Sequence, residues 1–338
     1  MLTRSLIFTG MMVALLSTQN AQAGTLDDIK AKAFVQCGIN QGLPGFATRD
    51  DQGRWKGLDV DFCRAVAAAV FGDVQKVKFT PLSAKERFSS LQSGDIDVLS
   101  RNTTWTSTRD TALGLSFVGT IFYDGQGFMV RKNSGVKSAK GLAGATICAN
   151  TGTTTELNVA DFFQQLGQKY ELVAFEKSDE ALKAYEQGRC DVYTTDHSGL
   201  SAQRLKLEKP TEHLILGQTI SKEPLGPVVR EADTRWFKIV RWTLFALINA
   251  EELGLTSANI DQMMKSKNPK IRRFVGLQGD FGAKLQLENN WAYNIVKLVG
   301  NYGEVFERNV GPKTPLNIAR GNNALWTKGG LHYAPPMR

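Results

Sequence analysis

The sequence predicts an α/β protein with two similar lobes, and three observations support this fold class. Between Phe79 and Thr104 we expect a strand, a helix that stops at a glycine, and a second strand that leads into polar residues. The order of helix, glycine, strand and polar residues returns between Ser178 and Ser198. The chain, at 338 residues, is also long enough for two domains. Two copies of one pattern indicate two lobes of one architecture, although strand–helix alternation is common enough to produce such an echo by chance.

The composition is that of an ordinary globular protein. Hydrophobic residues make up 42% and charged residues 22% of the chain, which excludes a disordered tail, a collagen-like fibre and a small disulfide scaffold. The formal charge of +8 comes from basic residues spread along the chain, so we expect no nucleic-acid partner. The four cysteines and three histidines show no Cys-x-x-Cys or His-x-x-x-His spacing, so we expect no metal site.

Residues 1–23 are predicted to be a secretory signal peptide. Arg4 supplies a positive charge, residues 6–16 form a short apolar core, and small residues precede the expected cleavage after Ala23. The alternative is a buried N-terminal strand or helix. The signal is favoured because no acidic residue occurs before Asp27 and the apolar run is too short to span a bilayer. The mature chain would then lie in an oxidising compartment outside the cytoplasm.

Export changes the interpretation of the four cysteines. Cys37 and Cys63 lie near the start of the mature chain, and Cys148 and Cys190 lie in its middle. This grouping suggests two disulfide bridges, Cys37–Cys63 and Cys148–Cys190. Four cysteines allow three pairings, and four buried thiols remain the alternative.

The elements of the first half follow from caps and apolar residues. Residues 58–71 are predicted to form a largely buried helix that ends at Gly72. In the first copy of the repeated pattern, Ser83 and Glu86 form a capping box, in which each side chain satisfies a backbone donor of the other residue. That helix ends at Gly94, and a strand follows.

The second half continues the alternation of strands and helices. Residues 122–130 are extended and contain a crossover between the lobes, and residues 224–227 are a candidate for a second crossover. A second capping box at residues 153–156 opens a helix that ends at Gly167. The remaining predicted elements are strands at 96–99, 146–149, 190–193 and 214–217, and helices at 178–187 and after Asp233.

Polar residues after the repeated strands are the candidate site, because ligands of open α/β sheets bind outside the carboxyl ends of strands. Arg109 is expected in the first turn of a helix capped by Thr106. A cation there opposes the helix dipole, so Arg109 is a candidate to hold a carboxylate with its forked guanidinium. Thr104 adds a hydroxyl group nearby.

The opposite lobe offers complementary groups. Thr153 and Thr154 lie at a predicted helix start, and Asp196 ends the second repeated strand, where it can take an ammonium group. An arginine, helix N-termini and one aspartate across a cleft form a receptor for the zwitterion of an α-amino acid. The plain alternatives are a salt-bridged surface arginine and an aspartate that only forms a turn.

Several motifs resemble those of the polar amino-acid-binding proteins of ABC importers. The matching motifs are Lys56-Gly57-Leu58-Asp59-Val60-Asp61, Gly94-Asp95-Ile96-Asp97, Thr104-x-Thr106-x-x-Arg109, Gly152-Thr153-Thr154 and Asp196. Three further stretches, at 42–46, 61–65 and 100–105, are similar to the general, broad-specificity members of this family. The resemblance covers essentially the whole mature chain.

The resemblance implies a type II periplasmic-binding-protein clamshell, in which each lobe is a mixed sheet flanked by helices and two hinge strands cross between the lobes. It places residues 24–124 and 225–338 in the first lobe and residues 125–224 in the second. It further implies a monomeric periplasmic receptor without a cofactor. The lobes would close on one L-amino acid and deliver it to the membrane permease subunits of an ABC importer.

The resemblance also assigns roles to the candidate residues. Arg109 would bind the α-carboxylate, with help from Thr104 and the turn at Thr153 and Thr154. Asp196 and the backbone near Asn102 would bind the α-ammonium group.

The chain departs from narrower relatives in two places. Many of them have a small residue and a glycine where this chain has Arg101 and Asn102, and an aromatic wall where it has Gly42 and Gly45. A less confining wall fits broad selectivity. Arg101 and Lys85 are candidates to attract acidic side chains, with exposed surface charge as the favoured alternative for Lys85.

The alternative function is a periplasmic dehydratase-type enzyme on the same fold. An enzyme needs a positioned acid or base in its cleft. Here the candidate residues are arginine, threonine and aspartate, and the imidazole nearest to them in the sequence is His197. Since Asp196 is explained by ammonium binding and no nucleophile has a base partner, we expect a binding protein without catalytic activity.

Overall fold

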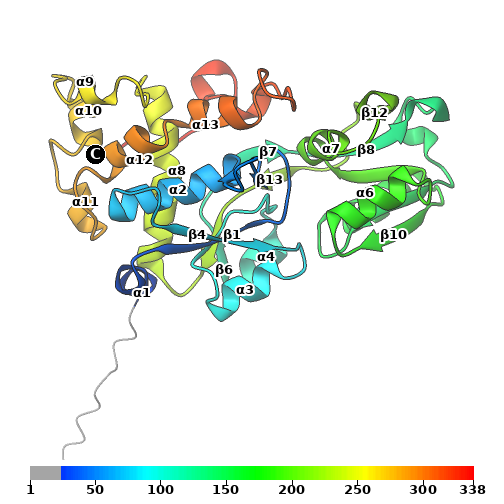
Figure 1. Cartoon of the computed structure of the whole chain (residues 1–338), viewed down its shortest axis with the longest axis horizontal. Helices are drawn as coiled ribbons and strands as arrows, with labels where there is room; N and C mark the ends of the chain where they lie inside the picture. The colour runs from blue at the N-terminus through cyan, green and yellow to red at the C-terminus, as the bar shows by residue number, and fades with distance from the viewer. Residues whose placement is uncertain (1–23) are drawn as a thin grey trace, which may run out of the picture.

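The computed structural model describes residues 24–338, so the predicted signal peptide and its cleavage position lie outside the described residues. The described chain forms two α/β lobes joined by a pair of short strands (Figure 1). The predicted fold class, with two sheets flanked by helices, is therefore confirmed. No helix within residues 24–338 is both long enough and apolar enough to cross a membrane.

The first lobe is built on a mixed five-stranded sheet. Its strands are β1 (Val35–Asn40), β4 (Val77–Leu82), β5 (Val98–Leu99), β6 (Leu115–Phe117) and β14 (Val228–Arg230). Their order is β4-β1-β5-β14-β6. β1 is parallel to β4 and β5, whereas β14 is antiparallel to β5 and β6. A separate small hairpin consists of β2 (Thr48–Arg49) and β3 (Trp55–Lys56).

The second lobe repeats this arrangement. Its strands are β8 (Gln126–Arg131), β9 (Thr146–Asn150), β10 (Glu171–Phe175), β11 (Val192–Asp196) and β12 (His213–Ile215). Their order is β10-β9-β11-β8-β12; β10, β9 and β11 are parallel, and β8 is antiparallel to its neighbours β11 and β12. The strands of the sequence echo, β5 and β11, occupy the same third position in their own sheets. The echo therefore reflects two lobes with matching sheets.

Helices cover both sheets (Figure 1). The first lobe carries α1 (Thr25–Lys32), α2 (Leu58–Phe71), α3 (Arg87–Ser93), α4 (Ser107–Thr111) and α8 (Thr234–Glu252). The second lobe carries α5 (Thr155–Leu166), α6 (Ser178–Glu186) and α7 (His197–Arg204). Short 3-10 turns occur at Lys132–Ser134, Ala139–Gly141, Pro210–Glu212, Gly321–Asn323 and Trp326–Lys328. α2 is buried over most of its length and ends at Gly72 in the left-handed conformation, as its sequence predicts.

Two strands form the connection between the lobes. β7 (Phe122–Asp124) leads into the second lobe, and β13 (Glu223–Leu225) leads back. They pair with each other in antiparallel fashion, with Tyr123 opposite Pro224. The two stretches that the sequence suggested as crossovers therefore lie side by side and form the hinge (Figure 1).

The C-terminal part of the chain packs on the first lobe. It contains α9 (Ile260–Met263), α10 (Pro269–Phe274), α11 (Phe281–Lys284), α12 (Trp291–Leu298) and α13 (Tyr302–Asn309). Apolar residues of α12 and α13 share one buried cluster with α2 and α8. The segment then returns to the hinge, where the Asn323 side chain accepts a hydrogen bond from the Tyr123 amide (2.7 Å) and donates one to the Tyr123 carbonyl (3.1 Å).

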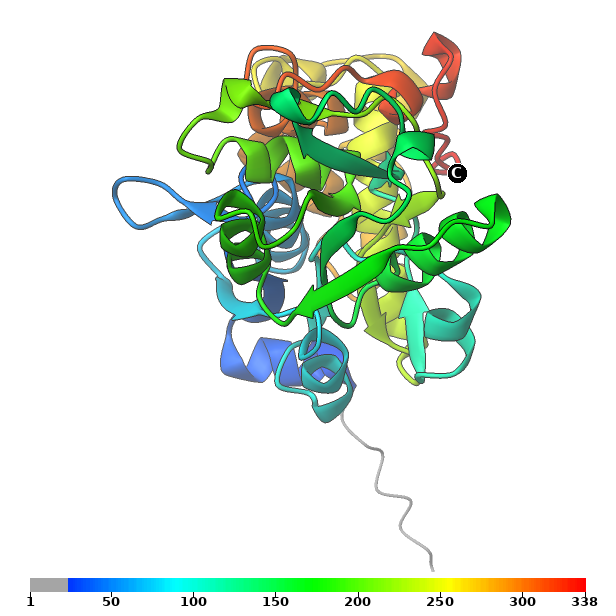
Figure 2. The same cartoon turned by 90° about the vertical axis from the view of Figure 1, so that its right-hand side faces the viewer.

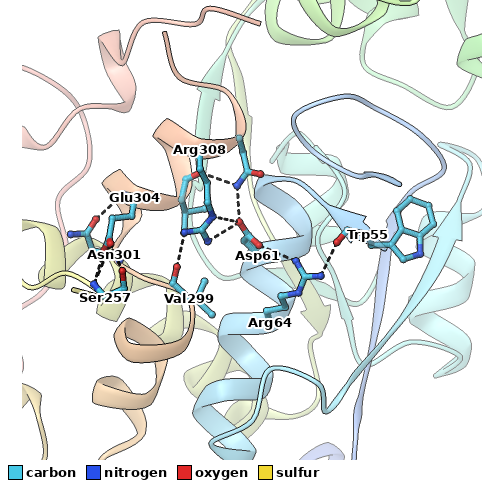
Figure 3. Close-up of polar contacts among 10 residues, drawn as sticks. Trp55, Asp61, Arg64, Ser257, Val299, Asn301, Glu304 and Arg308 are labelled. Carbon is cyan, nitrogen blue, oxygen red and sulfur yellow. Dashed lines mark hydrogen bonds and ion pairs between the residues drawn. The ribbon is translucent and has the colours of Figure 1, made fainter. Parts of the chain in front are cut away.

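A polar network centred on Asp61 ties this C-terminal segment to α2 (Figure 3). Arg308 of α13 donates from Nε to Asp61 (2.8 Å) and from Nη1 to the carbonyl of Val299 (2.7 Å). Arg64 donates to the other carboxylate oxygen of Asp61 (3.1 Å) and to the carbonyl of Trp55 (2.7 Å). The second aspartate of the Lys56–Asp61 motif thus holds two segments that are far apart in the sequence.

Both predicted disulfide bridges are present. Cys37 is bonded to Cys63, which joins β1 to α2. Cys148 is bonded to Cys190, which joins β9 to the turn before β11. No free cysteine remains within residues 24–338.

The structure corrects two local predictions. The second capping box is wrong, because the Thr153 hydroxyl donates to the carbonyl of Asn150 (2.6 Å) and Glu156 accepts from the amide of Gly152 (3.1 Å). β11 starts later than predicted and continues to Asp196, because its last residues pair with β8. The first capping box is confirmed by reciprocal bonds between Ser83 and Glu86, although α3 itself begins only at Arg87, after a turn at residues 84–86.

Candidate functional site

A pocket of about 680 Å³, partly open to solvent, lies between the lobes. In Figure 2 the second lobe faces the viewer and the first lobe lies behind it. The first lobe contributes the loop after β1, the start of α3 and the loop after β5, and the second contributes the starts of α5, α6 and α7. The pocket thus lies at the polar ends of the repeated strands, as the sequence predicts.

The pocket wall contains six of the eight predicted ligand-binding residues, namely Arg101, Asn102, Thr104, Thr153, Thr154 and Asp196. Arg109 and Lys85 are not part of the wall. Lys85 is exposed, and its backbone lies where the two lobes touch, with its Cα 3.3 Å from the position a Cβ of Gly152 would take. The structure therefore places Lys85 at the rim between the lobes.

Asp59, the first aspartate of the Lys56–Asp61 motif, fixes the loop that carries Arg101 and Asn102. Its carboxylate is buried and accepts hydrogen bonds from the Ser100 hydroxyl (2.9 Å) and the Asn102 amide (2.9 Å). Asn102 adopts a positive φ of 31°, and its side chain accepts a bond from Asn40 (3.0 Å). Burial raises the pKa of Asp59 to about 6, despite these bonds.

Arg109 lies directly behind the pocket wall. Its amide donates to the Thr106 hydroxyl (3.3 Å), which confirms the predicted cap of α4. Arg109 as a whole is 9% exposed, and its guanidinium donates through Nη1 to the Thr104 carbonyl (2.9 Å) and lies over the Phe88 ring. Burial lowers the pKa of Arg109, and the carboxylates of Glu223 and Asp196 oppose this change. Arg109 is therefore a buried cation close to the cleft.

Arg87 is a site residue that the sequence reasoning missed. It is 2% exposed and lines the pocket from the first turn of α3. It donates to the Thr103 hydroxyl (3.5 Å) and, across the cleft, to the Gly152 carbonyl (3.2 Å), while its buried Nε has no hydrogen-bond partner. Burial and the nearby Arg109 and Arg101 lower its pKa. The signal was available, because Arg87 is a cation in a capped first turn, like Arg109.

Asp196 faces these arginines from the second lobe. It is 8% exposed, lines the pocket and precedes α7 without capping it. Burial and the neighbouring carboxylates of Asp124 and Glu223 raise its pKa well above the usual range, although Arg87 and Arg109 act in the opposite direction. Burial and two neighbouring carboxylates disfavour the ionised form of Asp196, so a cation bound beside it would stabilise that form.

The threonines at the start of α5 connect the pocket to the hinge. The Thr154 hydroxyl donates to the carboxylate of Glu223 in β13 (3.0 Å). Glu223 also accepts bonds from Asn158 (2.6 Å) and Ser221 (2.6 Å). Thr154 therefore couples one wall of the pocket to a hinge strand.

The histidine next to Asp196 in the sequence lies outside the pocket, and the residues described include no cluster typical of a metal site. His197 does not line the pocket; its Nε2 lies 3.1 Å from the Thr219 hydroxyl, and burial lowers its pKa. No cluster of three potential metal ligands occurs within residues 24–338. What the cleft offers is opposed charge, with guanidinium groups on one lobe and a carboxylate on the other.

Two lobes, a paired-strand hinge and a polar cleft define a solute-binding protein of the clamshell type. The chain belongs to the bacterial extracellular solute-binding proteins, family 3, whose sequence profile matches residues 35–258.

Full-length relatives and a solved structure agree with this assignment. The chain is 61% identical to the general L-amino acid-binding periplasmic protein AapJ of Rhizobium johnstonii, over 97% of both chains. It is 52% identical to the glutamate/glutamine/aspartate/asparagine-binding protein BztA of Rhodobacter capsulatus, over 99% of both. A periplasmic binding protein of an ABC transporter from Brucella ovis, solved with glutathione bound, is 57% identical with a TM-score of 0.92; the match covers 94% of this chain and all of that one. These names describe binding proteins, so they support the receptor over the dehydratase-type enzyme.

Proposed function

We propose that this chain is a periplasmic receptor that captures L-amino acids of varied side chain and delivers them to the permease of an ABC importer. In this proposal the signal peptide is removed after Ala23, and the mature chain acts as a monomer without a cofactor. Residues 24–124 and 225–338 form the first lobe and residues 125–224 the second, so the chain divides at the hinge strands.

The opposition of charges across the pocket carries this proposal. Arg109, Arg87 and Arg101 place three buried guanidinium groups on the first lobe. Asp196 places a carboxylate on the second, where burial and the carboxylates of Asp124 and Glu223 raise its pKa despite the two nearby arginines. An α-amino acid zwitterion satisfies both sides, with its carboxylate at Arg109 and Thr104 and its ammonium at Asp196.

The other pocket residues fit the same role. Thr153 and Thr154 at the start of α5 support the ligand carboxylate from the second lobe, and Asn102 presents its backbone to the ammonium. Lys85 keeps the role of a surface charge at the rim, because its side chain is exposed.

A preference for acidic and amide side chains follows from the extra arginines. One guanidinium suffices for an α-carboxylate, so Arg87 and Arg101 remain for the ligand side chain. The unpartnered Nε of Arg87 is a buried donor that an acceptor on the ligand would satisfy. BztA is named as a binding protein for such ligands, and AapJ is named as a general L-amino acid-binding protein. Glutathione, which is bound in the Brucella ovis structure, also carries a free α-ammonium and α-carboxylate at its glutamyl end.

A thermal-shift screen tests the proposal. Residues 24–338 would be heated with each of the twenty L-amino acids, with D-glutamate and with glutathione, because a ligand that binds only the folded state raises its melting temperature. We expect shifts with many L-amino acids, the largest with acidic and amide side chains. If no amino acid shifts the melting temperature, the proposed function is refuted. The alternative of a dehydratase-type enzyme would then have to be tested.

A further inference from the structure

Two hydrogen bonds bridge the lobes away from the hinge in the described chain. One joins Arg87 to the carbonyl of Gly152 and belongs to the pocket. The other lies outside the pocket, where Lys206 of the second lobe donates from Nζ to the carbonyl of Gly42 in the first lobe (2.5 Å). The second bond can therefore influence closure without contacting a ligand.

The surroundings of Lys206 hold its ammonium group in place. Lys206 follows the end of α7, and its Nζ also lies 2.7 Å from a carboxylate oxygen of Asp179 on α6. The Lys206 side chain is 26% exposed, whereas that of Asp179 is 73% exposed. The carboxylate of Asp179 holds the Lys206 ammonium group on the second lobe. In this position Nζ can donate a hydrogen bond to the Gly42 carbonyl of the first lobe.

The acceptor lies on a loop that reaches the pocket. The Gly42 amide is held by the side chain of Asn40 (3.1 Å), and Asn40 lines the pocket. Asn40 in turn donates to the side chain of Asn102 (3.0 Å). The loop is thus fixed to the first lobe, and a bond to Gly42 from the other side holds the two lobes together.

We infer that Lys206 is a latch that sets the affinity for every ligand by stabilising the closed arrangement of the lobes. The inference rests on the proposed function, because a latch matters only if a ligand is enclosed. Apparent affinity is the intrinsic affinity multiplied by the fraction of protein in the competent state. Removing a bond that exists only when the lobes meet lowers that fraction. The loss is equal for all ligands because Lys206 contacts none of them.

The variant Lys206→Met tests the latch, because it keeps the apolar stem and removes the ammonium. We expect dissociation constants to rise roughly 3- to 10-fold for glutamate, glutamine and leucine alike, as for one charge-assisted bond at a partly exposed site. The dissociation rate should rise in proportion in stopped-flow measurements. Asp179→Asn should weaken binding in the same direction but less, since it removes only the anchor.

The matched control is Lys209→Met. Lys209 lies in the same segment and pairs with Glu212 of its own lobe (3.7 Å), so this variant should leave all affinities unchanged. Unchanged affinities in Lys206→Met would overturn the latch. A loss confined to acidic ligands would also overturn it, since that pattern indicates a long-range field acting on ligand charge.

X-ray scattering of the ligand-free proteins separates the latch from the proposed function. We expect a larger radius of gyration for Lys206→Met than for the wild type, because its lobes part more often. Identical scattering curves would refute the latch. This measurement needs no ligand, so it decides about Lys206 even if no amino acid binds, an outcome that would refute the receptor itself.

Discussion

Replacing Asp196 by asparagine tests the ammonium site with the least change in shape. Asp196 lines the pocket, is 8% exposed and lies close to the carboxylates of Asp124 and Glu223. Asparagine keeps the size of the side chain and its oxygen acceptor but removes the charge. The change therefore addresses the interaction between the carboxylate and the ligand ammonium.

The expected loss of affinity follows from the burial of the pair. Removing one partner of a buried, hydrogen-bonded charge pair costs about 2–5 kcal/mol, which corresponds to a rise in dissociation constant from about 30-fold to several thousand-fold. The factor should be similar for every amino acid, because all carry the same ammonium group. The ligand-free variant should melt no lower than the wild type, since the substitution removes the repulsion of Asp196 by the carboxylates of Asp124 and Glu223.

The affinity should also depend on pH in the wild type and lose most of that dependence in Asp196→Asn. In the free protein the pKa of Asp196 is raised well above its usual range, so Asp196 keeps its proton to a higher pH than an exposed aspartate does. A bound ammonium lowers this pKa, so binding releases the proton and becomes stronger as the pH rises toward the raised pKa. Asp124, whose pKa burial raises to about 6, adds to the same trend.

Isothermal titration calorimetry at several pH values measures both effects. Asp161→Asn is the matched control, since Asp161 is exposed on α5 of the same lobe. Its affinities should equal those of the wild type. Dissociation constants of Asp196→Asn within about threefold of the wild type would refute the ammonium site. Losses that differ strongly among side chains would show that Asp196 recognises the side chain instead.

Three further predictions concern the arginines and the fold. Arg109→Ala should lose about 2–5 kcal/mol of binding free energy for every amino acid, as measured by calorimetry. If the variant keeps the wild-type affinity, Arg109 does not bind the ligand carboxylate. Arg87→Gln should weaken glutamate and aspartate at least about tenfold more than leucine, because its guanidinium is assigned to the ligand side chain; equal losses would remove that assignment. Asp61→Asn should lower the free energy of unfolding by about 1–3 kcal/mol in urea denaturation, because it weakens the bonds to Arg308 and Arg64. The control variant Asp51→Asn should leave the free energy of unfolding nearly unchanged, because Asp51 is exposed.

Much of the fold could be predicted from local sequence signals. The helix at residues 58–71 has an apolar surface and a terminal glycine, and both features are local. The polar ends of the repeated strands indicated the site, because β5 and β11 lie at equivalent sheet positions. The C-terminal segment could not be placed, because its short helices depend on distant partners such as Asp61 and Tyr123.

The candidate site was predicted less completely than the fold. Six proposed residues line one pocket because they follow strand ends, which the pattern reveals. Arg87 was missed although its capped first turn is a local signal, because its burial depends on the approach of Gly152 from the other lobe. The predicted capping box at Thr153 was wrong for a related reason, because the Thr153 hydroxyl donates a hydrogen bond to the carbonyl of Asn150. Contacts between lobes and between distant loops are decided by tertiary packing.

Recognition of the α-ammonium and α-carboxylate, which all amino acids share, is the basis of the proposed function. Its most direct test is a calorimetric titration of the wild type with L-glutamine, its N-acetyl derivative and its α-carboxamide. We expect L-glutamine to bind and both derivatives to lose at least about 30-fold in affinity, because each lacks one charge of the zwitterion. A derivative that binds as tightly as L-glutamine would show that the cleft does not recognise the charge which that derivative lacks.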